Sequence, residues 1–139
     1  MRLEQETINL GKFRRGMHLI TPLIESMPLL SSIEKGIAHI FIQHTSASLT
    51  INENADPTVP QDLNMFLDAL IPDGDSRYTH HYEGPDDMPA HVKASVLGSS
   101  VTVPIQAGNL LLGTWQGVYL CEHRDEGGDR KITVTLLGN

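Results

Sequence analysis

The sequence predicts an α+β fold: an antiparallel β-sandwich of about seven strands with two or three helices packed alongside. The expected strands gather toward both ends of the chain with helices between them, whereas a βαβ fold would alternate the two. The 139 residues are close to the commonest size of one domain, and 40% of them are hydrophobic, enough for one core. No repeat or linker-like stretch interrupts residues 1–139, so we expect a single domain.

The N-terminal part of the chain predicts four strands and one short helix. Apolar and polar residues alternate over 4–10, 17–20, 36–43 and 49–54, the spacing of half-buried strands. Thr21 and Pro22 provide a helix N-cap followed by proline at the first helical position. A short helix is therefore expected from there to about residue 30.

The middle of the chain predicts two helices joined by a long polar loop. Over residues 58–71, five apolar side chains share one helical stripe: Leu63, Phe66, Leu67, Leu70 and Ile71. A loop rich in Gly and Asp follows over residues 73–88, long enough to suggest function rather than mere connection. Pro89 suits the first turn of a second helix, which Gly98 ends.

The C-terminal part of the chain predicts strands only. They are expected at residues 101–105, 109–112, 118–123 and 131–137. Because aromatic residues make up only 5% of the chain, Leu, Ile and Val are expected to build the core between these strands and the N-terminal ones.

The charge balance and the apolar pattern exclude two classes of partner. Ten Lys and Arg are spread against 17 Asp and Glu, whereas nucleic-acid-binding proteins gather basic residues on one face. No apolar run approaches the ~18 residues of a membrane span, and the first residues contain no signal segment. Cys121 has no disulfide partner within the chain, as is usual in a reducing compartment. We therefore expect a cytoplasmic protein that binds neither nucleic acid nor membrane.

Three polar stretches carry the candidate site residues, and the first is residues 44–56. It places one imidazole, four hydroxyls, two amides and two carboxylates between two predicted strands. His44 is a candidate metal ligand, and Ser46 and Ser48 are candidates for binding phosphate oxygens. The alternative is that these hydroxyls satisfy the backbone of a turn and that His44 is an exposed residue at a strand end.

The second stretch, residues 80–93, places two histidines around an acidic loop. His80, His91 and a carboxylate such as Asp87 would leave coordination positions open, as catalytic metal sites do. No compact metal-binding spacing occurs, so this interpretation depends on the residues meeting in space. Lys93 is either a solvated helix residue or a point charge for phosphate.

The third stretch, residues 113–130, combines the only tryptophan with ionisable residues. Trp115 lies between two glycines and beside Gln116, where it is either a packing anchor or a stacking surface for a substrate. Glu122 near a strand end could serve as a base or orient a ligand, and Arg130 suits carboxylate or phosphate. We expect Arg124 and Asp125 to form surface ion pairs, and Cys121 to be buried.

The sequences HTSASLTINENADPTVPQDL (residues 44–63), HHYEGPDDMPAHVKASVLGSS (80–100) and GTWQGVYLCEHRDEGGDR (113–130) resemble the signature blocks of the YjbQ family. The similarity spans residues 4–137. It implies a β-sandwich-containing α+β fold, assembly as a homotrimer, and a polar pocket of clustered histidines often associated with a divalent metal. By matching motifs, it also implies histidines and charged partners at six positions: His44, His80, His91, Asp87, Glu122 and Arg130. His81 and His123 fall outside this set.

Some members of the family are credited with a secondary thiamine-phosphate synthase activity. That reaction joins hydroxymethylpyrimidine diphosphate to thiazole phosphate and releases pyrophosphate. In this reaction Lys93 and Arg130 would bind phosphate groups. Asp87 or Glu122 would bind the cation, and Trp115 would stack on the ring of the substrate. A three-histidine site favours Zn²⁺ or another transition metal, although the reaction suits Mg²⁺. The alternatives are a metal-dependent hydrolase of a small phosphorylated or ester substrate, and a non-enzymatic trimeric ligand-binding protein.

Overall fold

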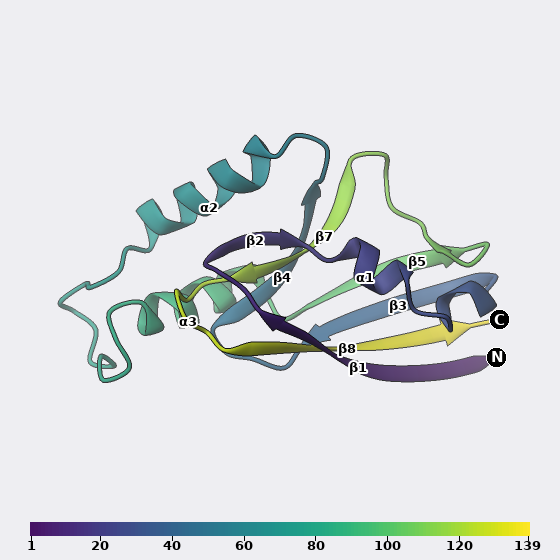
Figure 1. Ribbon diagram of the computed structural model, residues 1–139, viewed down its shortest axis with the longest axis horizontal. Coiled ribbons are helices and arrows are strands. Elements are labelled where there is room, and N and C mark those ends of the chain that lie inside the picture. Colours follow the sequence, from purple (N-terminus) through teal and green to yellow (C-terminus); the bar gives the residue numbers. More distant parts are fainter.

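The computed structural model describes residues 1–139 as a mixed α+β fold with two antiparallel sheets (Figure 1). The five-stranded sheet has the order β1-β8-β3-β5-β6, and the three-stranded sheet has the order β2-β7-β4. The first sheet contains β1 (Arg2–Lys12), β8 (Asp129–Gly138), β3 (Lys35–Ile42), β5 (Ser100–Gln106) and β6 (Asn109–Leu110). The second contains β2 (Gly16–Leu19), β7 (Gln116–Glu122) and β4 (Ala47–Glu53). The predicted fold class is confirmed.

Three α-helices and one 3₁₀ turn complete the fold: α1 (Thr21–Glu25), η1 (Leu30–Ser32), α2 (Thr58–Leu70) and α3 (Asp87–Leu97). The first predicted helix is shorter than expected because Pro28 has no N–H to continue it, and the chain resumes as η1. Thr21 is not the N-cap: its hydroxyl accepts a hydrogen bond from the Val118 N–H at 2.7 Å. The second long helix begins at Asp87, two residues before Pro89.

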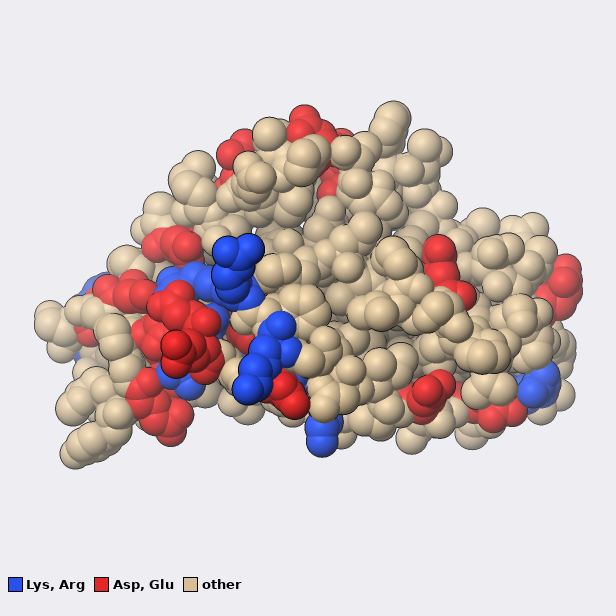
Figure 2. All heavy atoms as spheres, viewed as in Figure 1, with Lys and Arg blue, Asp and Glu red and all other residues tan.

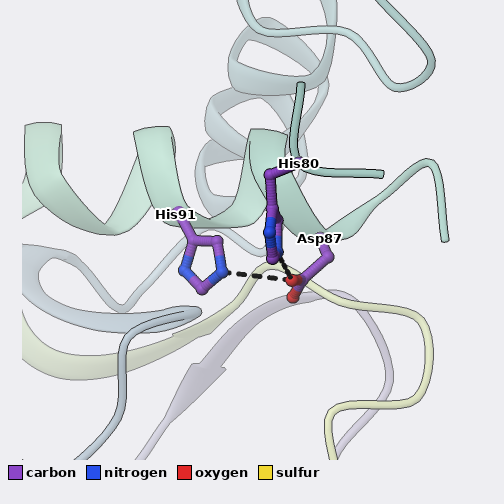
Figure 3. Close-up of side chains that lie close together, drawn as sticks. All are labelled: His80, Asp87 and His91. Carbon is purple, nitrogen blue, oxygen red and sulfur yellow. Dashed lines mark hydrogen bonds and ion pairs between the residues drawn. The ribbon is translucent and has the colours of Figure 1, made fainter. Parts of the chain in front are cut away.

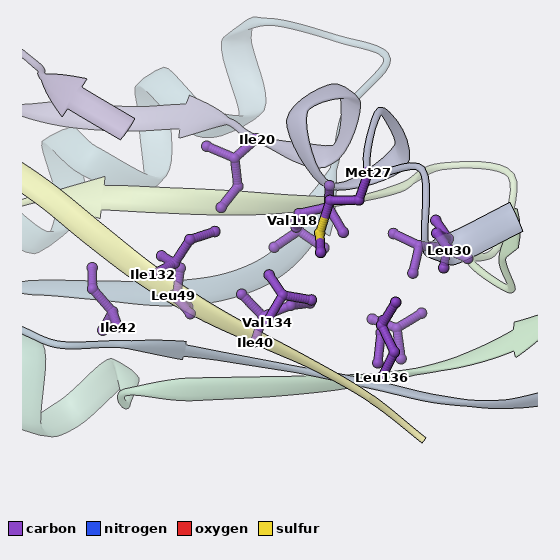
Figure 4. Close-up of a cluster of buried hydrophobic side chains, with 14 of the residues drawn as sticks. Ile20, Met27, Leu30, Ile40, Ile42, Leu49, Val118, Ile132, Val134 and Leu136 are labelled. Atoms are coloured by element: carbon purple, nitrogen blue, oxygen red, sulfur yellow. The ribbon is translucent and has the colours of Figure 1, made fainter. Parts of the chain in front are cut away.

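The apolar core lies between the two sheets (Figure 4). Along β8, every second position is buried: Arg130, Ile132, Val134, Leu136 and Gly138. The facing sheet contributes Leu49 and other aliphatic side chains, so Ile, Leu and Val build the core as expected. Arg130 is the only charged residue among the buried residues of β8. The apolar core therefore ends near Arg130, and polar side chains are buried beyond it.

The polar end of the molecule lies opposite the two termini. Figure 1 shows both termini at one end of the sheets, and α3 at the other end beside the β7–β8 turn. α3 packs against β4, and the loop between α2 and α3 lies beyond it. Figure 2 shows acidic and basic side chains gathered together at this same end.

α2 contacts β2 and β4 but is only partly covered by them. It has no buried residue, and Met65, Phe66 and Leu70 are each at least 60% exposed. An amphipathic helix normally buries its apolar face, so this one leaves an apolar surface without a partner in the chain. None of the helices has both the length and the apolar character needed to cross a membrane.

Candidate metal centre

Two histidines and one aspartate meet at the start of α3. His80 comes from the loop before the helix, Asp87 is the first residue of α3, and His91 lies one turn later (Figure 3). Residues four apart on a helix share one face, which brings Asp87 and His91 together. One potential ligand atom from each of the three residues lies within 4.8 Å of the others.

The Asp87 carboxylate is the buried centre of this cluster. Its Oδ2 atom lies 2.6 Å from Nε2 of His80 and 3.1 Å from Nε2 of His91. The side chain of Asp87 is 3% exposed, whereas those of His80 and His91 are 42% and 30% exposed. The carboxylate therefore forms the floor of the site, and the two imidazoles form a rim that solvent reaches.

The backbone fixes which nitrogen of His91 carries hydrogen. Nδ1 of His91 lies 2.8 Å from the carbonyl oxygen of Thr45, and because a carbonyl only accepts, Nδ1 is the donor. In the neutral ring Nε2 then has a lone pair, which faces a carboxylate oxygen that also only accepts. This contact requires a proton or a metal cation between the two atoms. A backbone carbonyl holding the far nitrogen is also how metal-binding histidines are usually oriented.

Arg124 approaches the other oxygen of the Asp87 carboxylate. Its Nε lies 3.3 Å from Oδ1 of Asp87, and its Nη2 donates to the carbonyl of Glu83 at 2.7 Å and to Asp86 at 3.4 Å. Burial raises the pKa of Asp87, but the hydrogen bond from His80 and the charges of His91 and Arg124 outweigh it, so the pKa is lowered. The carboxylate is therefore ionised and able to bind a cation.

His44 is not part of the cluster, which corrects the expected set of three histidines. Its Nε2 accepts a hydrogen bond of 2.8 Å from the backbone N–H of Lys131. Burial and the positive charge of Arg130 lower the pKa of His44, so the ring stays neutral. His44 lies two residues after β3, and its Nε2 binds a backbone donor of β8, so this nitrogen is not available to a metal. Asp87 takes the third place in the cluster.

Glu122 and Arg130, the expected catalytic partners, form a buried ion pair instead. Nε and Nη2 of Arg130 donate to the two oxygens of Glu122 at 2.7 and 2.5 Å, and Nη2 also donates to Oγ of Ser46 at 3.0 Å. Their side chains are 0% and 3% exposed. Gly127 closes over the pair: a Cβ there would lie 2.3 Å from Oε1 of Glu122. A substrate cannot reach either charge in this conformation.

The expected phosphate-binding residues Ser48 and Lys93 are buried as well. Oγ of Ser48 lies 2.8 Å from Nε2 of His123, and Nζ of Lys93 donates to Asp68 at 2.5 Å. The side chain of Lys93 is 1% exposed, so it is neither solvated nor open to a phosphate. Each of these residues, like Ser46, is thus buried and paired within the chain at the end of the fold that contains α3.

Trp115 and Gln116 lie at the other end of β7. Gln116 pairs with Glu53 and Glu122 with Ala47, so six residues separate Gln116 from the buried ion pair. At about 3.3 Å per residue this is ~20 Å, too far for Trp115 or Gln116 to share a ligand with the cluster in the same chain. Trp115 is 63% exposed, and the side-chain oxygen of Gln116 accepts the Gly113 N–H.

Sequence reasoning missed two residues of this region, Arg124 and His123. Arg124, expected in a surface ion pair, is instead mostly buried against Asp86 and Asp87. His123 is 2% exposed, and burial together with the charges of Lys93 and Arg130 lowers its pKa to about 3. Their position directly after the buried end of a strand was the available signal. The expectation for Cys121 is confirmed: it is buried, which raises its pKa to about 12.

Known proteins resemble this chain along nearly its whole length. The family model described as "UPF0047 protein YjbQ-like" matches residues 6–139. The UPF0047 protein YjbQ of Salmonella typhimurium is 51% identical over 135 residues, which cover 96% of this chain and 97% of that protein. A UPF0047 protein from Synechocystis is 41% identical, over 99% of this chain and 93% of that protein.

Solved structures share the fold. The crystal structure of a YbjQ-like protein of unknown function from Sulfolobus solfataricus superposes with a TM-score of 0.87 at 26% identity, covering 99% of each chain. A conserved hypothetical protein from Thermus thermophilus gives 0.85 at 34% identity, covering 95% of this chain and 99% of that one. These matches confirm the resemblance drawn from the three sequence blocks. The chain belongs to the YjbQ/UPF0047 family.

Proposed function

We propose that this protein is an enzyme that binds a divalent transition metal through His80, Asp87 and His91 and acts on a small molecule. One observation carries the proposal: Nε2 of His91 lies 3.1 Å from an oxygen of the ionised Asp87 carboxylate, and the Thr45 carbonyl holds the other ring nitrogen in place. His80 Nε2 points at the same oxygen. Without a metal, hydrogen atoms on the two imidazoles bridge to this carboxylate oxygen; a cation that displaced them would meet three ligand atoms in one place, two of them on solvent-exposed side chains.

The donor set favours zinc or another transition metal over magnesium. Two imidazoles and one carboxylate are ligands that Zn²⁺ and its neighbours prefer, whereas Mg²⁺ prefers oxygen ligands alone. Three protein ligands leave further coordination positions for water or substrate. When bound, such a metal polarises an oxygen atom of a substrate or lowers the pKa of a water molecule. Within the chain, the charge of Arg124 lies beside Asp87, and the Thr45 carbonyl orients the ring of His91.

Family resemblance makes thiamine-phosphate formation the first reaction to test. It would join hydroxymethylpyrimidine diphosphate to thiazole phosphate, with pyrophosphate as the leaving group. A departing diphosphate needs cationic groups. Because Lys93 and Arg130 are paired internally, Arg124 is the basic side chain nearest the cluster, and it is already bound to carboxylates. This observation favours the second candidate, a metal-dependent hydrolysis of a small substrate.

Metal binding is tested first. We expect elemental analysis of the purified protein, dialysed against Zn²⁺, to find one metal per chain. Asp87→Asn and His91→Gln should each weaken Zn²⁺ binding by at least about 10–100-fold, because each removes a ligand or changes its charge. His81→Gln is the matched control, since His81 neighbours His80 but lies outside the cluster. Equal Zn²⁺ affinity in all four proteins would reject this site.

Activity is tested second, with the Zn²⁺-loaded and the Mg²⁺-supplemented protein. One assay supplies both thiamine precursors, and the other supplies a panel of phosphate and ester substrates. We expect turnover that Asp87→Asn abolishes and His81→Gln preserves. Stoichiometric metal with no product in either assay would instead support a binding protein.

A further inference from the structure

A shallow pocket of about 330 Å³ adjoins the cluster on the side of His91. It is lined by His44, Thr45, His91, Ala94, Ser95, Gly98 and Ser99. His80 lines a different pocket, of about 370 Å³, formed mainly by the loop before α3. The cluster thus separates two hollows, and His91 is the residue that the first hollow shares with the candidate metal ligands.

The hydroxyl groups of this pocket have no partners within the chain. None of the side-chain hydrogen bonds of the structure involves the hydroxyl of Thr45, Ser95 or Ser99. Some surface hydroxyls elsewhere are engaged, such as those of Ser26 and Ser32, which donate to backbone carbonyls at 2.7 and 2.6 Å. Around this hollow, three exposed hydroxyls without a partner in the chain lie together.

The ring of His44 adds one hydrogen-bond donor to this pocket, its Nδ1–H group. Because its Nε2 accepts from the Lys131 N–H, the proton of the neutral ring must be on Nδ1. No group of the chain accepts from this Nδ1 atom, and the ring lines the pocket. The structure thus holds an imidazole N–H and three hydroxyls around one space beside His91.

The lining contains no Lys, Arg, Asp or Glu. Two basic residues buried nearby are committed elsewhere: Arg130 binds Glu122, and Lys93 binds Asp68. Apart from a metal bound through His91, a phosphate group in this pocket would therefore find no cationic partner. A neutral group rich in oxygen atoms matches the lining, because each hydroxyl can both donate and accept.

We propose that this pocket binds the substrate of the metal site, and that the part of the substrate it holds is a neutral, hydroxyl- or carbonyl-bearing group. The inference rests on the proposed metal centre and adds the substrate class to it. The volume lies at the lower end of the ~300–1,000 Å³ of ligand pockets, which suits a group the size of a small sugar.

The test follows backbone amide NMR signals of the full-length protein, both metal-free and Zn²⁺-loaded. The neutral probes are ribose and erythritol, and the matched anionic probes are ribose 5-phosphate and erythritol 4-phosphate. We expect the neutral probes to shift the amide signals of Thr45, Ser95 and Ser99. The phosphorylated probes should bind there at least about tenfold more weakly.

Two variants connect the binding to this pocket. The double variant Ser95→Ala with Ser99→Ala removes two free hydroxyls and should weaken binding of the neutral probes by roughly tenfold, since each lost hydrogen bond lowers affinity several-fold. Ser76→Ala, in the pocket lined by His80, is the matched control and should change affinity less than about twofold.

Three outcomes would overturn the inference. Neutral probes that leave the Thr45, Ser95 and Ser99 signals unchanged, with and without Zn²⁺, would reject the pocket. Phosphorylated probes that bind more tightly and depend on Ser95 and Ser99 would reject the neutral class. Neutral probes that bind without any effect on the His91 signals of the Zn²⁺-loaded protein would reject its role as the substrate pocket. If only the proposed metal centre is wrong, the purified protein will contain no bound Zn²⁺, and elemental analysis detects this independently of the probes.

Discussion

The two ends of the molecule are buried by different chemistry. Toward the termini, β3 and β8 bury Ala38, Ile40, Val134 and Leu136 in an apolar core. At the opposite end, on and beside α3, equally complete burial covers charged and polar side chains: Ser48, Lys93, Glu122, His123 and Arg130. The apolar core tolerates small changes of shape, whereas each buried charge depends on one partner at a fixed distance. Stability should therefore be distributed differently at the two ends.

The largest effect is expected from breaking the buried ion pair. Glu122→Ala should destabilise the protein by about 3–5 kcal/mol, because it leaves the guanidinium of Arg130 buried without its carboxylate. Replacing both residues, Glu122→Met with Arg130→Met, should be milder than Glu122→Ala alone. Urea unfolding measures both. A double variant no more stable than the single one would show that the pair is not the reason for the loss.

The next effect comes from the metal centre. Zn²⁺ at 100 times its dissociation constant should raise the free energy of unfolding by about 2.7 kcal/mol, since a ligand that binds only the folded state stabilises it. At the same Zn²⁺ concentration the gain should fall to about 0.4–1.4 kcal/mol or less in Asp87→Asn, which removes the charge between the two histidines and weakens binding by at least about 10–100-fold. Unfolding curves with Zn²⁺ and with a chelator check this. Equal stabilisation of Asp87→Asn would place the bound metal elsewhere.

Acid should weaken the polar end through His123. Burial, together with Lys93 and Arg130, lowers its folded pKa to about 3, whereas in the unfolded chain the pKa is about 6.5. Between these values the unfolded state binds the extra proton, so this contribution to stability is present above pH ~6.5 and is lost as pH falls toward ~3.

The variant His123→Gln separates this contribution from that of other groups. Relative to the parent protein, it should be less stable by more than about 1 kcal/mol near neutral pH, and the difference should shrink as pH falls through ~5. His81→Gln, at an exposed position, serves as the control. A difference independent of pH in urea unfolding would contradict the assignment.

The apolar end should respond less to a comparable change. Ile40→Val removes one buried methylene group from the core and should cost about 0.5–1.5 kcal/mol, independent of pH and of metal. Urea unfolding at neutral and acidic pH checks both statements. A strong dependence on pH would mean that the two ends are energetically coupled.

The smallest effect on chain stability is expected at α2. We propose that its exposed apolar face joins copies of the chain, in the homotrimer that the family resemblance implies. Phe66→Ser should change stability by no more than about 0.5 kcal/mol but lower the molecular mass in solution measured by light scattering. Ser76→Ala provides the control. A parent protein that runs as a monomer would contradict the assembly.

The same contrast explains what the sequence could predict. Alternating Ile, Leu and Val report burial directly, and all eight strands lie where the pattern placed them, with ends shifted by a few residues. His80, Asp87 and His91 were found as candidates because their residue types carry metal chemistry. That these three residues lie together could not be predicted from their spacing in the sequence, because His80 belongs to an irregular loop.

The structure of the polar end was harder to predict, because buried charged residues produce no periodic pattern in the sequence. Lys93 and Arg124 would be solvated in most proteins, and their partners Asp68 and Asp87 lie 25 and 37 residues away. Likewise, Glu122 and Arg130 were predicted to be catalytic because charged residues near strand ends often take part in catalysis. In the structure their charges face each other. The role of Thr45 rests on a backbone carbonyl, which every residue possesses.

The closure of the Glu122–Arg130 pair by Gly127 constrains how this protein can vary. Any side chain at position 127 would overlap Oε1 of Glu122 and Nη2 of Arg130, which a Cβ would approach to 2.3 and 2.5 Å. The turn between β7 and β8 can therefore change in length or charge only if position 127 remains a glycine. Engineers who wish to graft a recognition loop at this corner must keep that glycine or redesign both charges beneath it.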